Sequence, residues 1–183
     1  MCLIDKWIRT NSKKKYDYKG NIAKSGKINK RILEYVMRSW YFYFIECKNL
    51  RVLKNSFDIK FFEYFFGGSS LPLLKRLSLK DGAATLTEIT ARILLRDFSF
   101  KVLKTSKFIL CGGGRKNNFL VKIIKKCIKS LKLIDHLGVN GDFVESQAFA
   151  YLAIRSYLGL AISFPETTGC KKSSTGGIKV KNY

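Results

Sequence analysis

Three consecutive glycines separate an apolar segment from a segment with helical periodicity in "FILCGGGRKNNFLVKII", residues 108–124. Glycine lets the backbone turn sharply and approach another group closely. The helix that follows would direct its free N–H groups at the same place, which is how α/β proteins hold phosphate. Two interpretations stand side by side. One is a phosphate-binding turn, and the other is a plain connection between a strand and a helix, because a glycine turn alone is a weak signature.

Hydrophobic periodicity predicts many helices and few strands. Helices are expected over residues 1–10, 27–40, 56–66, 78–98 and 141–159, and a further helix is expected to open at Asn117 or Asn118. The clearest of them is 78–98, in which Leu86, Ile89, Ile93 and Leu94 recur with helical spacing. Strands are expected at 106–111 and 131–134, and loops at 11–26 and 46–55. A sheet of one or two strands is not stable alone. Either the pattern conceals further strands, or other strands of the fold lie outside this chain.

The charge of the chain is strongly positive, with 35 Lys and Arg against 13 Asp and Glu. A net charge of +22 invites a nucleic-acid interpretation. The basic residues are spread over the whole sequence, however, and Lys, Asn, Ile and Phe are all abundant, as an AT-rich genome would produce. Compositional bias is therefore favoured over nucleic-acid binding. A basic module that binds nucleic acid or an acidic surface stays open as the alternative function.

Cysteine and histidine usage predicts no metal site. The five cysteines include no C-x-x-C pair, and the single histidine is His136. Reduced thiols of this kind are typical of the cytoplasm. No signal peptide is recognised, and the longest aromatic run, residues 40–45, is too short to cross a bilayer, so no membrane partner is expected.

A pair of carboxylates follows the glycines. Asp142 and Glu145 would lie on the same side of the helix predicted at 141–159, which Gly159 is expected to end. One interpretation is a capping box, with Asp142 as N-cap and Glu145 reaching back to it. The functional alternative is that the carboxylates bind sugar hydroxyls beside a phosphate site.

Several blocks, in the same order, resemble the C-terminal half of the anhydro-N-acetylmuramic acid kinase family of actin-like sugar kinases. These blocks are "LIDKW" and "YDYKG" near the start, "ATLTEITA" at 84–91, "LCGGGRKNNFL" at 110–120, "LGVNGDFVESQAFAYLAIR" at 137–155 and "FPETTGCKKSSTGG" at 164–177. The resemblance implies an α/β fold, namely the C-terminal lobe of the actin-like ATPase (ribonuclease H-like) fold, helix-rich and without its first strands. Residues 1–170 are assigned to this incomplete lobe. The polar composition of residues 171–183 predicts a loose basic tail.

The resemblance also implies a function. Members of the family use ATP, with Mg²⁺, to open the ring of 1,6-anhydro-N-acetylmuramic acid and phosphorylate it at the 6-position during peptidoglycan recycling. Gly112, Gly113, Gly114 and Asn117 would line the nucleotide, and Glu145 would help to hold the anhydro sugar, while Asp142 stays a helix cap.

The resemblance also indicates what this chain lacks. The family's Asp-x-Gly-Pro-Gly-Asn loop, whose aspartate activates water, would end where Met1 stands. No residue of this chain is therefore assigned a catalytic role, and the chain alone is expected to be inactive. Two interpretations of the fragment stay open: it is one lobe of a split, frameshifted or truncated gene, or it is a subunit whose N-terminal half is encoded as a separate chain. The family also suggests a second copy in a homodimer.

Overall fold

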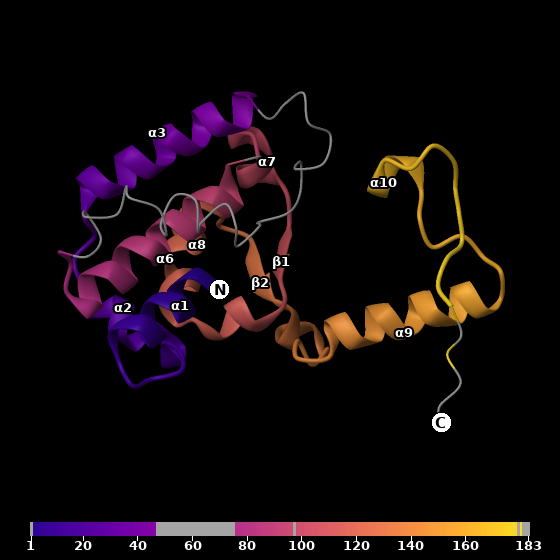
Figure 1. Cartoon of the computed structure of the whole chain (residues 1–183), viewed down its shortest axis with the longest axis horizontal. Coiled ribbons are helices and arrows are strands. Elements are labelled where there is room, and N and C mark those ends of the chain that lie inside the picture. Colours follow the sequence, from indigo (N-terminus) through magenta and orange to yellow (C-terminus); the bar gives the residue numbers. More distant parts are fainter. Residues whose placement is uncertain (1, 47–75, 97, 179, 181–183) are drawn as a thin grey trace. The chain divides into compact units, whose positions relative to one another are not determined.

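The computed structural model describes residues 2–46, 76–96, 98–178 and 180. The helix predicted at 56–66 and nearly all of the loop predicted at 46–55 lie outside these residues. The chain divides into two compact units, Met1–Leu133 and Ile134–Tyr183 (Figure 1). Each unit is described by itself.

The first unit is built mainly from helices. Its elements are α1 (Cys2–Asn11), η1 (Tyr18–Gly20), α2 (Asn21–Lys24), α3 (Lys30–Glu46), α6 (Leu79–Leu95), α7 (Phe100–Thr105), β1 (Phe108–Leu110), η3 (Gly113–Lys116), α8 (Asn118–Cys127) and β2 (Leu131–Leu133), where η marks a 3-10 helix. Helix α6 contacts α1, α2, α3 and α8, so it is the central helix of this unit (Figure 1).

The core forms where α6 meets α1 and α3. Leu86, Ile89 and Ile93 of α6 are buried there, as their spacing predicts. They pack with buried side chains of α1 and α3, and each such side chain contributes about 1.5–3 kcal/mol to folding. Leu94 was expected on the same face but is 43% exposed, because it follows Ile93 directly and points away from the core.

Both predicted strands are present, each shorter than expected. β1 and β2 form a parallel pair in which Phe108 lies beside Leu131 and Leu110 beside Leu133. A parallel pair needs a crossover connection, which α8 provides. The buried face of α8 packs against both strands in a second core cluster. The chain is thus mixed α/β, helix-rich, with a small parallel sheet among its described residues.

The loop predicted at 11–26 contains short helices. The buried carboxylate of Asp17 accepts the N–H groups of Ile22 at 2.8 Å and Ala23 at 2.9 Å and so holds the start of α2. The end of this segment is held from α6, because Asp81 accepts the N–H of Lys27 at 2.6 Å. Helix α7 was not predicted either. The short helices at 11–26 were missed because contacts with residues distant in sequence hold them. Helix α7 was missed because it is too short to show a periodic pattern.

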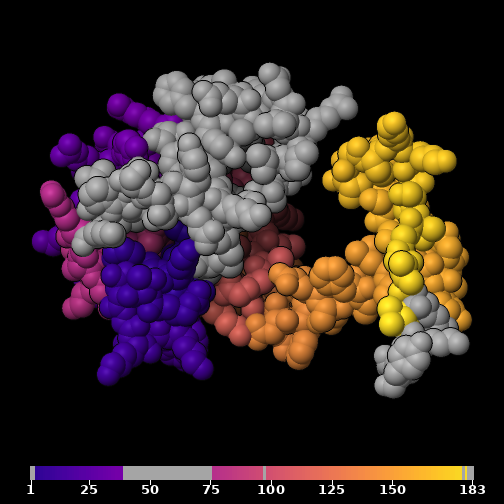
Figure 2. Space-filling model, in the orientation of Figure 1, coloured from indigo at the N-terminus to yellow at the C-terminus, as the bar shows by residue number. Residues whose placement is uncertain are grey.

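The second unit contains η4 (Ile134–Leu137), α9 (Val144–Tyr157) and α10 (Pro165–Thr168). No residue of α9 is buried, although the helix is apolar on most sides, and Figure 2 shows its side chains (orange) on the surface. The tail expected to be loose is partly ordered, since Ser174 pairs with Ser163 in an antiparallel bridge.

The C-terminus of α9 is the one that the sequence predicts. Gly159 follows the helix with φ +70°, donates to the carbonyl of Ser156 at 3.0 Å, and the N–H of Leu160 reaches back to Arg155 O at 2.8 Å. This is a Schellman motif, in which the left-handed residue is normally glycine.

Candidate functional site: a glycine turn before α8

The glycine triplet forms a tight turn between β1 and α8. Gly112 has φ +74°, a conformation that favours glycine, and Gly113 begins the short helix η3. The N–H of Arg115 donates to Gly112 O at 3.2 Å, and the N–H of Asn117 donates to Gly114 O at 3.1 Å. The turn is therefore closed by its own backbone and leads directly into α8.

Nothing in the described chain requires a glycine at position 113. Its φ is not in the left-handed region, and a Cβ built on it would meet no described atom within 4 Å. Gly26 and Gly82 of this unit differ. A Cβ on Gly26 would lie 2.0 Å from Lys80 O, and one on Gly82 would lie 2.2 Å from the ring of Trp7. The space at Gly113 is thus open to a ligand that approaches the backbone.

The segment that contains the turn is basic. The side chain of Arg115 is only 5% exposed, and its guanidinium donates to Gly112 O at 3.1 Å. The sequence from 98 to 134 contains no Asp or Glu, while lysines recur along it. A basic segment of this kind attracts anions such as phosphate. Arg115 was not predicted as a site residue, because nothing in the sequence spacing indicates that this arginine would be buried.

Asn117 ends the turn and begins α8. As predicted, the helix opens at this position: Asn117 is its N-cap, and its Oδ1 accepts the N–H of Leu120 at 2.9 Å. The side chain is only 1% exposed, and its Nδ2 is buried with no hydrogen-bond partner among the described residues. The predicted contact of Asn117 with a nucleotide stays a prediction.

Glu145 lies in the second unit, in the first turn of α9, where it is exposed. The prediction that Asp142 is the N-cap of this helix is wrong. Asn140 Oδ1 accepts the N–H of Asp142 at 3.0 Å and Asn140 O that of Phe143 at 3.1 Å, so residues 140–143 form a turn. The helix begins only at Val144, with Phe143 in the cap position.

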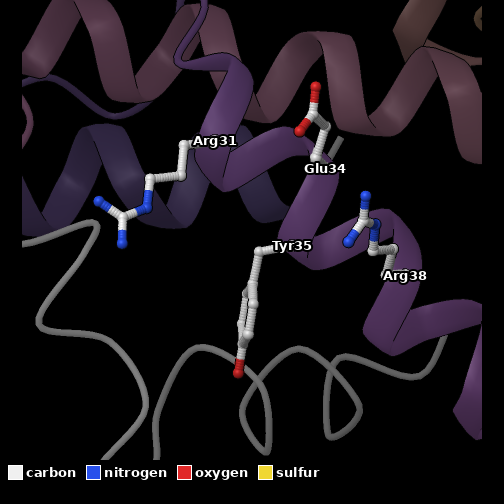
Figure 3. Close-up of a pocket in the computed structure, with 4 residues that line it drawn as sticks. All are labelled: Arg31, Glu34, Tyr35 and Arg38. Carbon is white, nitrogen blue, oxygen red and sulfur yellow. The ribbon is translucent and has the colours of Figure 1, made fainter.

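One face of α3 lines a hollow (Figure 3). Its lining residues are Arg31, Glu34, Tyr35 and Arg38. In Figure 3 their side chains spread apart: Tyr35 points to the side opposite Glu34, and the two guanidinium groups do not converge. These four side chains offer no shared binding point for a ligand.

Metal clusters and membrane-spanning helices are both absent from the part of the chain that the structure describes. Across residues 2–46, 76–96, 98–178 and 180, no group of three or more His, Cys, Asp or Glu side chains gathers where it could hold a metal ion. Over those same ranges, the helices are all too short or too polar to span a membrane.

Comparison with known proteins gives a consistent family. The family model described as anhydro-N-acetylmuramic acid kinase matches residues 1–181. A protein of that name from Pelagibacter ubique is 43% identical over 100% of this chain and 47% of its own length. Proteins of the same name from Zymomonas mobilis and Methylobacterium nodulans are 34% and 32% identical, over 96% and 98% of this chain. The chain spans less than half the length of these relatives, 44–47%.

Proposed function

Because this chain belongs to the anhydro-N-acetylmuramic acid kinase family, we propose that it contributes the nucleotide-binding turn and one sugar-binding carboxylate to an ATP-dependent anhydro-sugar kinase. The product would be N-acetylmuramic acid phosphorylated at its 6-position. The proposed architecture is the C-terminal lobe of the actin-like fold over residues 1–170, followed by a basic tail at 171–183. The proposed compartment is the cytoplasm.

The open space at Gly113 is the observation that carries this proposal. A side chain there would clash with nothing in the described chain, so the glycine is best explained by a group that approaches the backbone from outside. A nucleoside diphosphate or triphosphate suits such a turn, because its phosphates accept from backbone N–H groups and are attracted by the lysines of 98–134. Gly112, Gly113 and Gly114 would contact the nucleotide through their backbone, and Asn117 completes the turn.

Glu145 is the proposed sugar contact. It is exposed and ionisable, and it stands at the first turn of α9, where an acceptor for sugar hydroxyl groups would be held on a regular helix. Mg²⁺ would arrive with the nucleotide. This ion usually keeps several waters and binds through substrate phosphates and one or two carboxylates, so a cage of protein side chains is not needed.

The remaining parts of the reaction would come from the portion of the family protein that this chain does not cover. Relatives are about twice as long, at 47% coverage for the first of them. A general base has to lie within hydrogen-bond reach of the attacking water, and phosphoryl transfer needs a complete cradle for the γ-phosphate. The proposed partner is therefore a polypeptide equivalent to the N-terminal half. A homodimer is the second proposed assembly.

A phosphorylation assay tests the proposal. The 183-residue chain is incubated with labelled ATP, Mg²⁺ and the anhydro sugar, alone and with the N-terminal half of the Pelagibacter ubique relative. We expect no turnover alone and measurable turnover from the mixture, lost in Glu145→Gln. Glu166→Gln, in the same unit, is the matched control and should behave as the parent. Turnover that survives Glu145→Gln contradicts the assigned sugar contact. Binding of nucleic acid and ADP with the same salt dependence, and no turnover from the mixture, would favour the basic-module alternative.

A further inference from the structure

The side chain of Asn117 is covered by a loop from the other end of the first unit. The covering residue is Gly20, the last residue of η1, with φ +74°. A Cβ built on Gly20 would lie 2.1 Å from Oδ1 of Asn117 and 3.0 Å from Cβ of Phe119. The backbone of Gly20 therefore lies directly against the amide group that begins α8.

This covering loop, residues 17–20, is itself held firmly. Asp17 is 2% exposed, and both of its carboxylate oxygens accept backbone N–H groups, from Ile22 and Ala23. The N–H of Gly20 also donates to the carbonyl of Asp17 at 3.1 Å. A buried carboxylate that accepts two N–H groups fixes the backbone around it, because leaving those donors unpaired is costly. The loop is thus a rigid support and not a flexible connection.

Asn117 joins this support to the glycine turn. Its N–H closes the turn by donating to Gly114 O at 3.1 Å, and its Oδ1 holds the first turn of α8 through Leu120. A shift of its side chain breaks the bond to Leu120, and a shift of its backbone moves the end of the glycine turn. With 1% exposure, the side chain has no room to swing into solvent without displacing the loop at Gly20.

We propose that the loop 17–20 is a positioning element for the nucleotide turn, and that Asn117 and Gly20 transmit its position. The segments "YDYKG" and "CGGGRKN" then lie against each other and act together. Asn117 acts through the turn and the helix start, and Gly20 has no side chain because Asn117 occupies that space. This inference rests on the proposed nucleotide binding for its functional part, while the contact itself is a property of the fold.

The substitution Gly20→Val tests the contact. The branched side chain would push Asn117 out of place, so we expect amide hydrogen exchange over residues 112–121 of the full chain to become at least tenfold faster. Exchange over the core of α6 should change much less, whereas general destabilisation would accelerate both. Gly159→Val is the matched control, because Gly159 has a similar φ of +70° but no atom of the described residues within 4 Å of a Cβ. It should leave exchange over 112–121 unchanged.

The second variant is Asn117→Ser, which keeps an oxygen for the N–H of Leu120 but removes the amide that lies against Gly20. It serves if Gly20→Val fails to fold, and it should also speed exchange over 112–121. In the parent and in Gly159→Val, ADP should slow exchange over 112–121, and this protection should be lost in Gly20→Val and in Asn117→Ser.

Parent-like exchange over 112–121 in folded Gly20→Val, or in Asn117→Ser, overturns the inference. Faster exchange in these variants, together with no ADP protection in the parent, supports the contact and refutes the proposed nucleotide binding instead.

Discussion

Gly113→Ala should separate binding from stability. The added methyl group meets no atom of the described chain within 4 Å, and the φ of Gly113 is one that alanine adopts without strain. Such a replacement stabilises a protein by about 0.4–1 kcal/mol, chiefly by restricting the unfolded chain. For a chain of this length the melting temperature should rise by about 1–4 °C.

The same methyl group should weaken nucleotide binding. One face of a binding cleft buries little of a ligand, so we expect the parent to bind ADP with a Kd of about 1 mM, near −4 kcal/mol. A methyl group forced into a close contact typically costs about 1–3 kcal/mol, which corresponds to a loss of about fivefold to 150-fold in affinity. The variant is thus expected to be slightly more stable and to bind much more weakly.

The assay is an NMR titration with ADP, read at amides of residues 112–121, together with thermal melting. It is run at low salt and in about 1 M salt, where the Debye length is about 3 Å and diffuse attraction to lysines is screened. Gly176→Ala is the control, since a Cβ there would make only an ordinary contact with Ile162 Cδ1 at 3.8 Å. If Gly113→Ala bound ADP in high salt as well as the parent does, the glycine turn would be a plain connection between strand and helix.

Three further predictions concern buried or hydrogen-bonded carboxylates, each checked by denaturant unfolding. Burial raises the pKa of Asp5, and the nearby charge of Asp17 adds a smaller effect in the same direction. The ionised carboxylate therefore destabilises the fold above that pKa. Asp5→Asn should be more stable than the parent at pH 7 but not at pH 3. The opposite holds for Asp81, whose pKa is lowered by the hydrogen bond from the backbone of Lys27: Asp81→Asn should lose stability at pH 7, and the difference should disappear as the pH falls through the folded pKa. Asp17→Ala leaves the N–H groups of the α2 start unpaired and should cost at least about 2 kcal/mol. A pH-independent difference for either of the first two, or a loss below about 0.5 kcal/mol for the third, contradicts the assigned cause.

The sequence predicts those parts of the fold that short-range patterns determine. The apolar spacing in α6, the strand at Phe108 and the start of α8 after Asn117 are all confirmed. In each case the signal is a periodicity or a cap within one segment. The predicted start of α9 is too early, because Asn140 and not Glu145 accepts the N–H of Asp142, and residues 140–143 form a turn before the helix begins.

The candidate site is only partly predictable, for a different reason. The glycine turn can be read from its letters, but the burial of Asn117 and the role of Gly20 depend on a contact between segments far apart in sequence. Nothing in the sequence near residue 20 indicates which side chain will occupy the space that a Cβ would take. The family block "YDYKG" identifies this segment but does not indicate what it does.

The contact between Gly20 and Asn117 also has a consequence for the order of events during synthesis. Chains grow from the N-terminus at about 5–20 residues per second, so the loop at Gly20 precedes Asn117 by about 5–20 s. β1, η3, α8 and β2 are contiguous in sequence and can pair locally as soon as they emerge. Ile4 and Ile8 of α1 are covered only after α6 has been synthesised, several seconds later. Until then, these apolar side chains are exposed to the ribosome surface and to chaperones.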